Sequence, residues 1–137
     1  KKTVGLAVQA LAALGEADRQ RVRLVLAGGY DERLPENVEH AAELAALAKD
    51  LGVADRVVQM RSVGASTKAT LLRHCACLLY TPDREHFGIV PVEAMYARVP
   101  VLAVNTGGPL ESIAEGETGF LRPQEPGAWA EVVSTLL

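Results

Sequence analysis

Residues 76–104 read ACLLYTPDREHFGIVPVEAMYARVPVLAV, and this stretch decides the fold. The apolar runs at its two ends, 76–80 and 101–104, are typical of buried strands. Between them, a loop over 83–87 leads into an expected helix over about 88–97. A strand, a helix and a second strand in this order predict a parallel pair of strands joined by a crossover helix.

The same alternation continues over the whole chain, which predicts an α/β fold. We expect a Rossmann-like domain with a mostly parallel sheet and helices on both faces. Ligands of such a sheet bind beyond the carboxyl ends of its strands, so the loops after residues 27, 60, 80 and 104 are the candidate site. The other expected helices are 2–15, 35–51, one capped by Ser66 or Thr67, 110–114 and one from 127; the other strands are 22–27, 57–60 and 119–121.

Composition and charge exclude several classes of function. The 137 residues suit one domain, without internal repeats or linkers. A net charge of −3 and the lack of a basic cluster argue against a nucleic-acid partner. The apolar runs are too short to span a membrane. Cys75 and Cys77 are expected to be buried thiols, although a soft metal site with His74 is conceivable.

The residues 85–95, EHFGIVPVEAM, carry the chemistry of the candidate site. Gly88 lets a ligand approach the backbone closely, and the first turn of the helix after it has N–H groups without intrahelical partners. Such a turn favours a diphosphate. Glu85 and Glu93 flank the turn, and a carboxylate accepts hydrogen bonds from two sugar hydroxyls. From the spacing alone, two solvated glutamates remain the alternative.

This stretch resembles the Glu-x7-Glu motif of the GT-B-fold retaining glycosyltransferases, with Glu85 and Glu93 as its two acids. The Phe-Gly-Ile and Glu-Ala-Met segments around the acids match as well. Further matches follow in register at 100–104, 107–108 and 118–121. Within that family, the chain is similar over nearly its whole length to mannosyltransferases of the dolichol pathway, in the segments 27–33, 36–40, 80–82 and 107–113.

The resemblance implies that residues 1–137 are the C-terminal donor-binding domain of a longer two-domain enzyme. The donor would be GDP-mannose, and the acceptor would be a lipid-linked oligosaccharide that binds through an N-terminal domain. The enzyme would work at the cytosolic face of the endoplasmic reticulum membrane, and the fragment itself would be soluble. Neither a metal nor another cofactor is implied, and the chain has no Asp-x-Asp pair to hold a metal.

The resemblance also implies roles for individual residues. The catalytic residues would be Glu85, which would contact the transferred mannose, and Lys2, which would neutralise the departing diphosphate. Glu93 would hold the ribose diol. The remaining donor-binding residues would be Val63 and Lys68 beside the base, His86 near the hexose, the backbone N–H groups of Phe87, Gly88, Ile89 and Val90, and the pocket glycines Gly28, Gly107 and Gly108.

The chain departs from the family pattern ahead of Lys2. The family has an arginine there, on a strand that would be central in the sheet, between residues 22–27 and 76–80. We therefore expect the isolated chain to be inactive as a transferase and to bind its donor weakly at best. Three alternatives stay open: a transferase that uses a UDP-sugar, a dinucleotide-binding module, for which Gly28-Gly29-Tyr30 lacks the third glycine, and a fragment that pairs with a partner chain.

Overall fold

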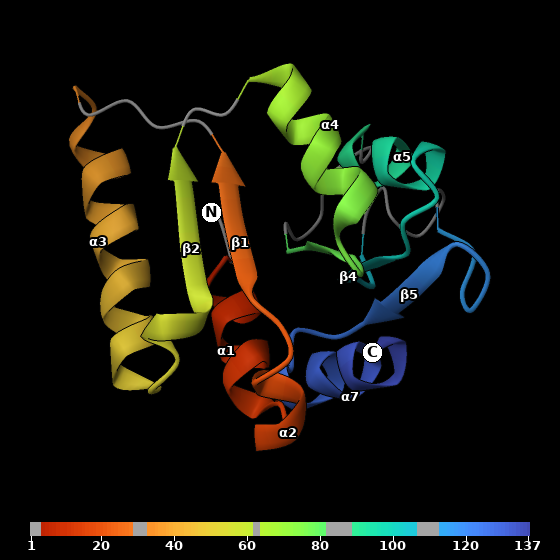
Figure 1. Cartoon of the computed structure of the whole chain (residues 1–137), viewed down its shortest axis with the longest axis horizontal. Helices are drawn as coiled ribbons and strands as arrows, with labels where there is room; N and C mark the ends of the chain where they lie inside the picture. Colours follow the sequence, from red (N-terminus) through yellow and green to blue (C-terminus); the bar gives the residue numbers. More distant parts are fainter. Residues whose placement is uncertain (1–3, 29–32, 62–63, 82–88, 107–112) are drawn as a thin grey trace.

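The computed structural model describes residues 4–28, 33–61, 64–81, 89–106 and 113–137 (Figure 1). The predicted alternation of helices and strands is confirmed. The helices are α1 (Gly5–Ala13), α2 (Glu16–Arg19), α3 (Pro35–Asp50), α4 (Ala65–His74), α5 (Ile89–Tyr96) and α7 (Pro126–Leu136), with a 3-10 turn η1 (Ala54–Arg56); the strands are β1 (Leu24–Gly28), β2 (Val57–Arg61), β3 (Leu78–Tyr80), β4 (Val101–Val104) and β5 (Gly119–Arg122).

Every strand pair is parallel, as predicted, but the strands form two sheets rather than one. Strand β1 pairs with β2, and β3, β4 and β5 form a second sheet in that order. Among the described residues no strand pairs with the second edge of β1 or of β3.

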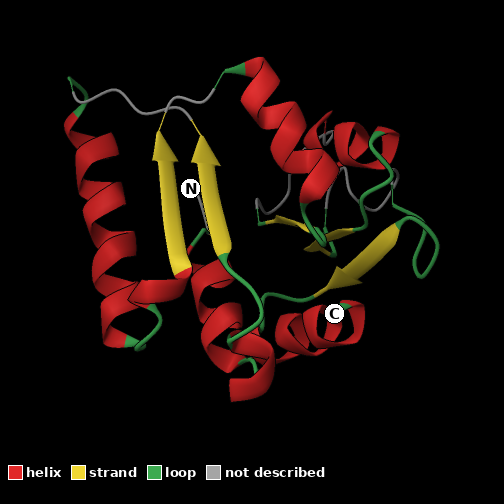
Figure 2. Cartoon of the chain, in the orientation of Figure 1, coloured by secondary structure: helices red, strands yellow, loops and turns green. Residues whose placement is uncertain are grey.

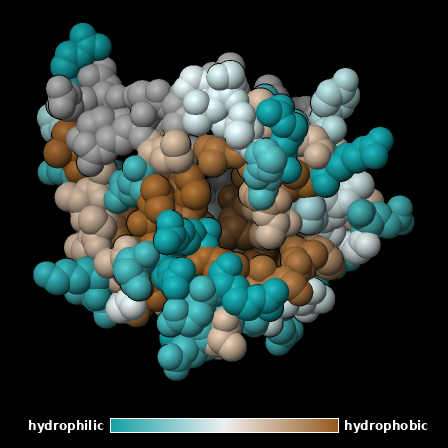
Figure 3. All heavy atoms as spheres, in the orientation of Figure 1, coloured by the Kyte–Doolittle hydropathy of each residue, from teal (hydrophilic) through white to brown (hydrophobic). Residues whose placement is uncertain are grey.

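A groove of about 990 Å³ lies between the two sheets. Leu24, Val25 and Leu26 of β1 line it on one side, and Leu78 and Leu79 of β3 line it on the other. Helices α1, α3 and α4 also contribute to its wall. Figure 3 shows apolar side chains gathered around the hollow between β1, β2 and the second sheet. The groove therefore separates two sheet edges whose backbone groups have no strand partner among the described residues.

Helix α1 joins the two sheets because two of its faces are apolar. Val8 and Leu11 belong to a cluster with α3, against which Leu24 of β1 packs. Leu6 and Ala10 belong to another cluster, formed with β4 and α7. An amphipathic helix normally buries a single stripe. Here the apolar residues around the helix provide a contact for each sheet.

The second sheet has helices on both faces, as Figure 2 shows for β5 and its surroundings. Strand β4 is fully buried, which explains its uninterrupted apolar sequence. Leu102 and Val104 pack toward α1 and α7, whereas Val101 and Ala103 pack toward α5. Trp129 of α7 is fully buried in the cluster that β4 forms with α1 and α7. The prediction of a two-faced sheet is thus confirmed for β3–β5.

The first sheet is covered differently. Leu24 and Val57 face the cluster formed by α1 and α3, while their neighbours Val25 and Val58 are each 38% exposed. Val25 and Val58 are paired in the strand register, so they share the opposite face.

Within the described ranges, no helix is both long and apolar enough to cross a membrane.

Two local expectations differ from the structure. Helix α4 begins at Ala65 after Gly64, without a side-chain cap, so neither Ser66 nor Thr67 is its N-cap. Instead, Thr70 Oγ1 donates a hydrogen bond of 3.0 Å to the Ser66 carbonyl inside the helix. Helix α1 ends at Ala13 rather than 15, because the backbone of Leu14 is extended. Arg19 of the short helix α2 donates hydrogen bonds to the carbonyls of Ala12 and Leu14 there. The segment 107–112 of the expected helix 110–114 lies outside the described residues.

Candidate functional site

The candidate site lies around the helix that follows β3. The chain leaves β3 at Tyr80, passes the buried Thr81, and enters α5 at Ile89. Helix α5 is fixed by Ala94, which is fully buried in the cluster with Val101 and Ala103. Glu93 precedes Ala94 by one residue, so its side chain points about 100° away from the buried direction. The carboxylate therefore reaches the solvent-accessible side of the helix, where its side chain is 45% exposed.

Helix α4 brings a cation to this carboxylate. The Nζ atom of Lys68 lies 3.1 Å from Oε1 of Glu93, with the lysine side chain 46% exposed. The sequence assigned both residues to donor binding through separate parts of the resemblance. The structure brings them together from α4 and α5, which follow different strands in different sheets.

The direction of Lys68 follows from how α4 packs. Leu72 lies four residues after Lys68 and packs against the cluster that contains Ala94. Residues four apart lie on one face of a helix, so the contact made by Leu72 turns Lys68 toward α5. Lys68 also lines the groove between the two sheets. The ion pair thus lies at the rim of that groove.

Other predicted site residues are placed by their backbone alone. Gly28 is the last residue of β1, at a carboxyl end of the first sheet. Ile89 and Val90 form the start of α5, where N–H groups lack intrahelical acceptors. Eight predicted residues lie outside the described residues and stay predictions: Lys2, Val63, Glu85, His86, Phe87, Gly88, Gly107 and Gly108.

The expectation of two buried thiols is wrong for Cys75. Cys75 is exposed as the residue after the last turn of α4, while Cys77 is half-buried. The segment between α4 and β3 is therefore less covered than its apolar sequence indicates, because β3 begins only at Leu78. Burial raises the pKa of Cys77 to about 11. Across the described ranges, no group of three or more His, Cys, Asp or Glu residues is arranged to hold a metal ion.

A second ion pair, which the sequence did not reveal, lies near the carboxyl end of β5. Arg122 Nη1 donates to Glu115 Oε2 at 2.8 Å, and the Leu121 backbone N–H donates to Oε1 of the same carboxylate. These bonds close the turn that precedes β5, together with a bond from the Ala114 N–H to Thr118 Oγ1. We therefore assign this pair to the fold, since its contacts satisfy backbone and side-chain groups of the turn itself.

Comparison with known proteins adds four findings to this geometry. A family model described as "Glycosyl transferases group 1" matches residues 1–137. The chain is 47% identical over 141 residues to "Alpha-1,3/1,6-mannosyltransferase ALG2" of Homo sapiens. That alignment covers 100% of this chain and 34% of the relative. It is 40% identical over 163 residues to the protein of the same name from Saccharomyces cerevisiae, with 97% of this chain and 32% of the relative covered.

A solved structure matches the fold. The crystal structure of Anabaena Alr3699/HepE in complex with UDP and glucose superimposes with a TM-score of 0.84 at 29% identity, over 98% of this chain and 34% of that one. The chain therefore spans about a third of the length of the proteins that it matches.

Proposed function

Because this chain belongs to the group 1 glycosyl transferases, we propose that it binds the nucleotide-sugar donor of a retaining mannosyltransferase, with GDP-mannose as that donor. The observation that carries the proposal is the 47% identity to the human α-1,3/1,6-mannosyltransferase along the entire chain. The Lys68–Glu93 pair at the edge of the groove supports it, because it holds a half-exposed carboxylate that can accept hydrogen bonds from sugar hydroxyls.

In this proposal, Glu93 accepts hydrogen bonds from the ribose diol. The start of α5, at Ile89 and Val90, presents N–H groups that have no acceptor within the helix, and the positive end of the helix dipole, to the diphosphate. Glu85 contacts the transferred sugar. Lys2 and the helix terminus stabilise the negative charge that develops on the departing GDP. No metal takes part in these steps.

The acceptor in this proposal is a lipid-linked oligosaccharide, held by the remainder of a longer protein at the endoplasmic reticulum membrane. The names of the relatives support mannosyl transfer, and the partial coverage of those relatives supports a second domain. We expect the present chain alone to lack transferase activity.

One alternative has an observation in its favour. The HepE structure that shares the fold contains UDP and glucose, so a UDP-sugar is the second candidate donor. The choice between guanine and uracil depends on residues beside the base, and Val63, one of those implied, lies outside the described residues.

The test is to titrate the chain with GDP-mannose, UDP-glucose and NAD. Binding is measured by calorimetry, or by NMR where it is weak. We expect GDP-mannose to bind best. Glu93→Ala should weaken this binding by about 1–3 kcal/mol, the range for loss of a hydrogen bond to a charged group. Glu39→Ala is the matched control, because Glu39 is an exposed glutamate within α3.

The outcomes separate the candidates. Stronger binding of UDP-glucose would support the alternative donor, and stronger binding of NAD would favour the dinucleotide-binding module. Equal affinity of the parent chain and Glu93→Ala would remove Glu93 from the site.

A further inference from the structure

The ion pair between α4 and α5 has a feature that the family resemblance does not explain. The resemblance implies that Lys68 borders the nucleotide base, yet in the structure its ammonium contacts the carboxylate of Glu93 at 3.1 Å. Both side chains are about half exposed, so they remain accessible to a ligand. The contact therefore joins two groups of the same candidate site to each other.

From this geometry we infer that Lys68 is a positioning residue, which orients the Glu93 carboxylate toward the ribose hydroxyls of a bound nucleotide. The inference rests on the proposed function, since it requires that Glu93 hold a ribose diol. It adds a specific route of action: Lys68 acts through Glu93 and does not contact the nucleotide.

The chemistry of the contact fits this role. An ionised carboxylate has about four acceptor positions on its two oxygens. The ammonium of Lys68 contacts Oε1, which leaves Oε2 available to vicinal hydroxyls. A free glutamate on a helix surface samples several rotamers and must lose that freedom when a ligand binds. A carboxylate already held through one oxygen loses less, so it binds a diol more tightly.

The packing beneath the pair gives it a defined geometry. Leu72 of α4 and Ala94 of α5 meet in one apolar cluster, and each lies close in sequence to one member of the pair. Lys68 shares a helix face with Leu72, and Glu93 adjoins Ala94. Two helices docked through this cluster hold the backbones of Lys68 and Glu93 at a fixed separation. The pair is therefore supported from below, unlike an isolated ion pair on a single exposed helix.

Charge gives a second reason for the contact. A diphosphate binding at the start of α5 would repel an unpaired carboxylate one turn further along the helix. The positive charge of Lys68 offsets that of Glu93, so the local charge near the diphosphate stays close to neutral. Lys68 thus lets an acidic hydroxyl-binding group operate beside an anionic ligand.

The test compares two nucleotides on the chain and its variants. GDP carries both ribose hydroxyls, and 2′,3′-dideoxy-GDP keeps the base and phosphates but lacks both. We expect Lys68→Met to weaken GDP binding about two- to fivefold, the upper part of the range for a half-exposed ion pair. Binding of dideoxy-GDP should weaken by a clearly smaller factor, because that ligand senses only the uncompensated charge of Glu93 near its phosphates. Lys68→Arg should retain most of the affinity, because a guanidinium also pairs with a carboxylate.

Two further variants complete the design. In a Glu93→Gln background, Lys68→Met should have no additional effect on GDP binding, because the two residues act in series. Lys49→Met is the matched control, an exposed lysine in the last turn of α3, and should change neither affinity. In the ligand-free chain, Lys68→Met should shift the ¹³C NMR signal of the Glu93 carboxylate, and Lys49→Met should not.

Several results would overturn the inference. Equal weakening of both nucleotides by Lys68→Met would mean that Lys68 contacts the base or phosphates or acts on the fold alone. An unchanged Glu93 signal in the ligand-free Lys68→Met variant would show that the pair does not form. If the parent chain binds neither nucleotide, the proposed function fails and this inference fails with it. A parent that discriminates between the nucleotides through Glu93, but not through Lys68, would refute the inference alone.

Discussion

Replacement of Gly119 by alanine should break the pairing of β4 with β5. A Cβ atom at Gly119 would lie 2.2 Å from the carbonyl oxygen of Val101 and 3.1 Å from Cγ2 of Ile113. Carbon atoms approach carbonyl oxygens to about 3.3–3.6 Å even in close contacts. The backbone of one strand must therefore move by about 1 Å, because the obstructing oxygen belongs to the main chain of a fully buried strand.

The expected cost follows from the hydrogen bonds around this position. A displacement disturbs the bond from the Val101 N–H to the Thr118 carbonyl and the bond from the Gly116 N–H to the Gly119 carbonyl. Each contributes about 1 kcal/mol, and a buried group left unpaired costs more. We expect Gly119→Ala to lower the free energy of unfolding by about 2–4 kcal/mol, a large share of the roughly 5–15 kcal/mol typical of a domain.

Urea unfolding monitored by tryptophan fluorescence measures this change. Trp129 is the single tryptophan of the chain, it is fully buried, and its Nε1–H donates to the Pro123 carbonyl at 2.9 Å. Gly127→Ala is the matched control, because a Cβ there meets nothing within 4 Å and the residue lies in α7. The control should be at least as stable as the parent, since alanine is the better helix former.

A stable Gly119→Ala variant would refute the reasoning. If its unfolding midpoint equals that of the parent or of Gly127→Ala, then β5 does not approach β4 as closely as the structure shows. A changed slope of the free energy against urea, rather than a changed midpoint, would instead indicate an altered denatured or native compactness.

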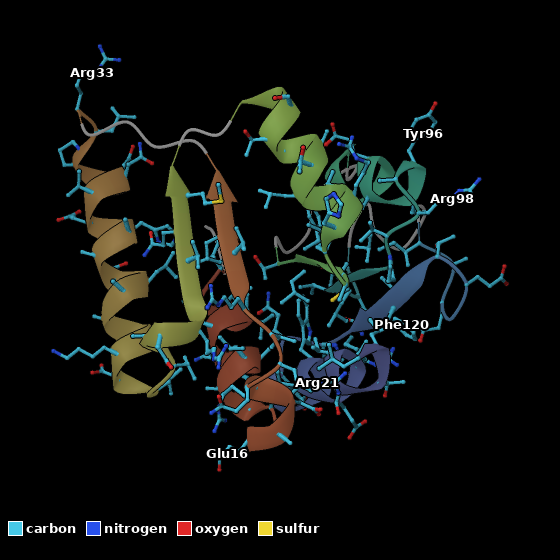
Figure 4. All side chains as sticks on the ribbon, in the orientation of Figure 1. Glu16, Arg21, Arg33, Tyr96, Arg98 and Phe120 are labelled. Atoms are coloured by element: carbon cyan, nitrogen blue, oxygen red, sulfur yellow. The ribbon has the colours of Figure 1, made fainter. Side chains whose placement is uncertain are left out.

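Three further perturbations are expected to change stability. Arg98 follows α5 with a φ of 64°, a left-handed backbone conformation that favours glycine, and its side chain points into solvent beside Tyr96 (Figure 4). Arg98→Gly should therefore raise the free energy of unfolding, measured in urea, by about 1 kcal/mol; a loss of stability would contradict this. Burial raises the pKa of Cys77 from 9.0 to about 11; the unfolded chain then loses its thiol proton first, so stability should fall between about pH 9 and 11, and Cys77→Ala should reduce that slope. The hydrogen bond from Arg122 holds the pKa of Glu115 below its ordinary value, so its contribution is present at neutral pH and lost as pH falls through the lowered pKa. Glu115→Gln should therefore weaken the loss of stability at acid pH, and high salt should weaken it too, because the carboxylate is largely exposed. If the variant loses stability with acid as the parent does, the Arg122 bond does not cause this dependence.

The sequence predicted the elements of the fold because their signals are local. The apolar run at Val101–Val104 and the helical segment before it needed no knowledge of distant residues, and both are confirmed. Parallel pairing followed from the alternation itself, since a helix between two strands returns the chain to the same end of the sheet. The role of Glu93 was proposed from its motif and its expected place on a helix, and that role stays a prediction.

The sequence could not predict features that depend on which surfaces meet. The capping expectation at Ser66 failed because several nearby residues satisfy the same pattern, and the start of α4 is set by how the helix packs. The exposure of Cys75 depends on where β3 begins to pair with β4, which is a property of two strands together.

The sequence by itself thus determined the strand and helix segments and their parallel direction, because spacing and residue type act over a few positions. The assignment of Glu85 and Glu93 to the candidate site came from the family resemblance and stays a prediction. Only the tertiary structure decided that the strands divide into two sheets across a groove and that α1 packs against both. It also decided that Lys68 meets Glu93, 25 positions later in the numbering. That contact requires α4 and α5 to pack on one apolar cluster, which Leu72 and Ala94 share, and such packing is set by the burial of apolar surface between distant segments.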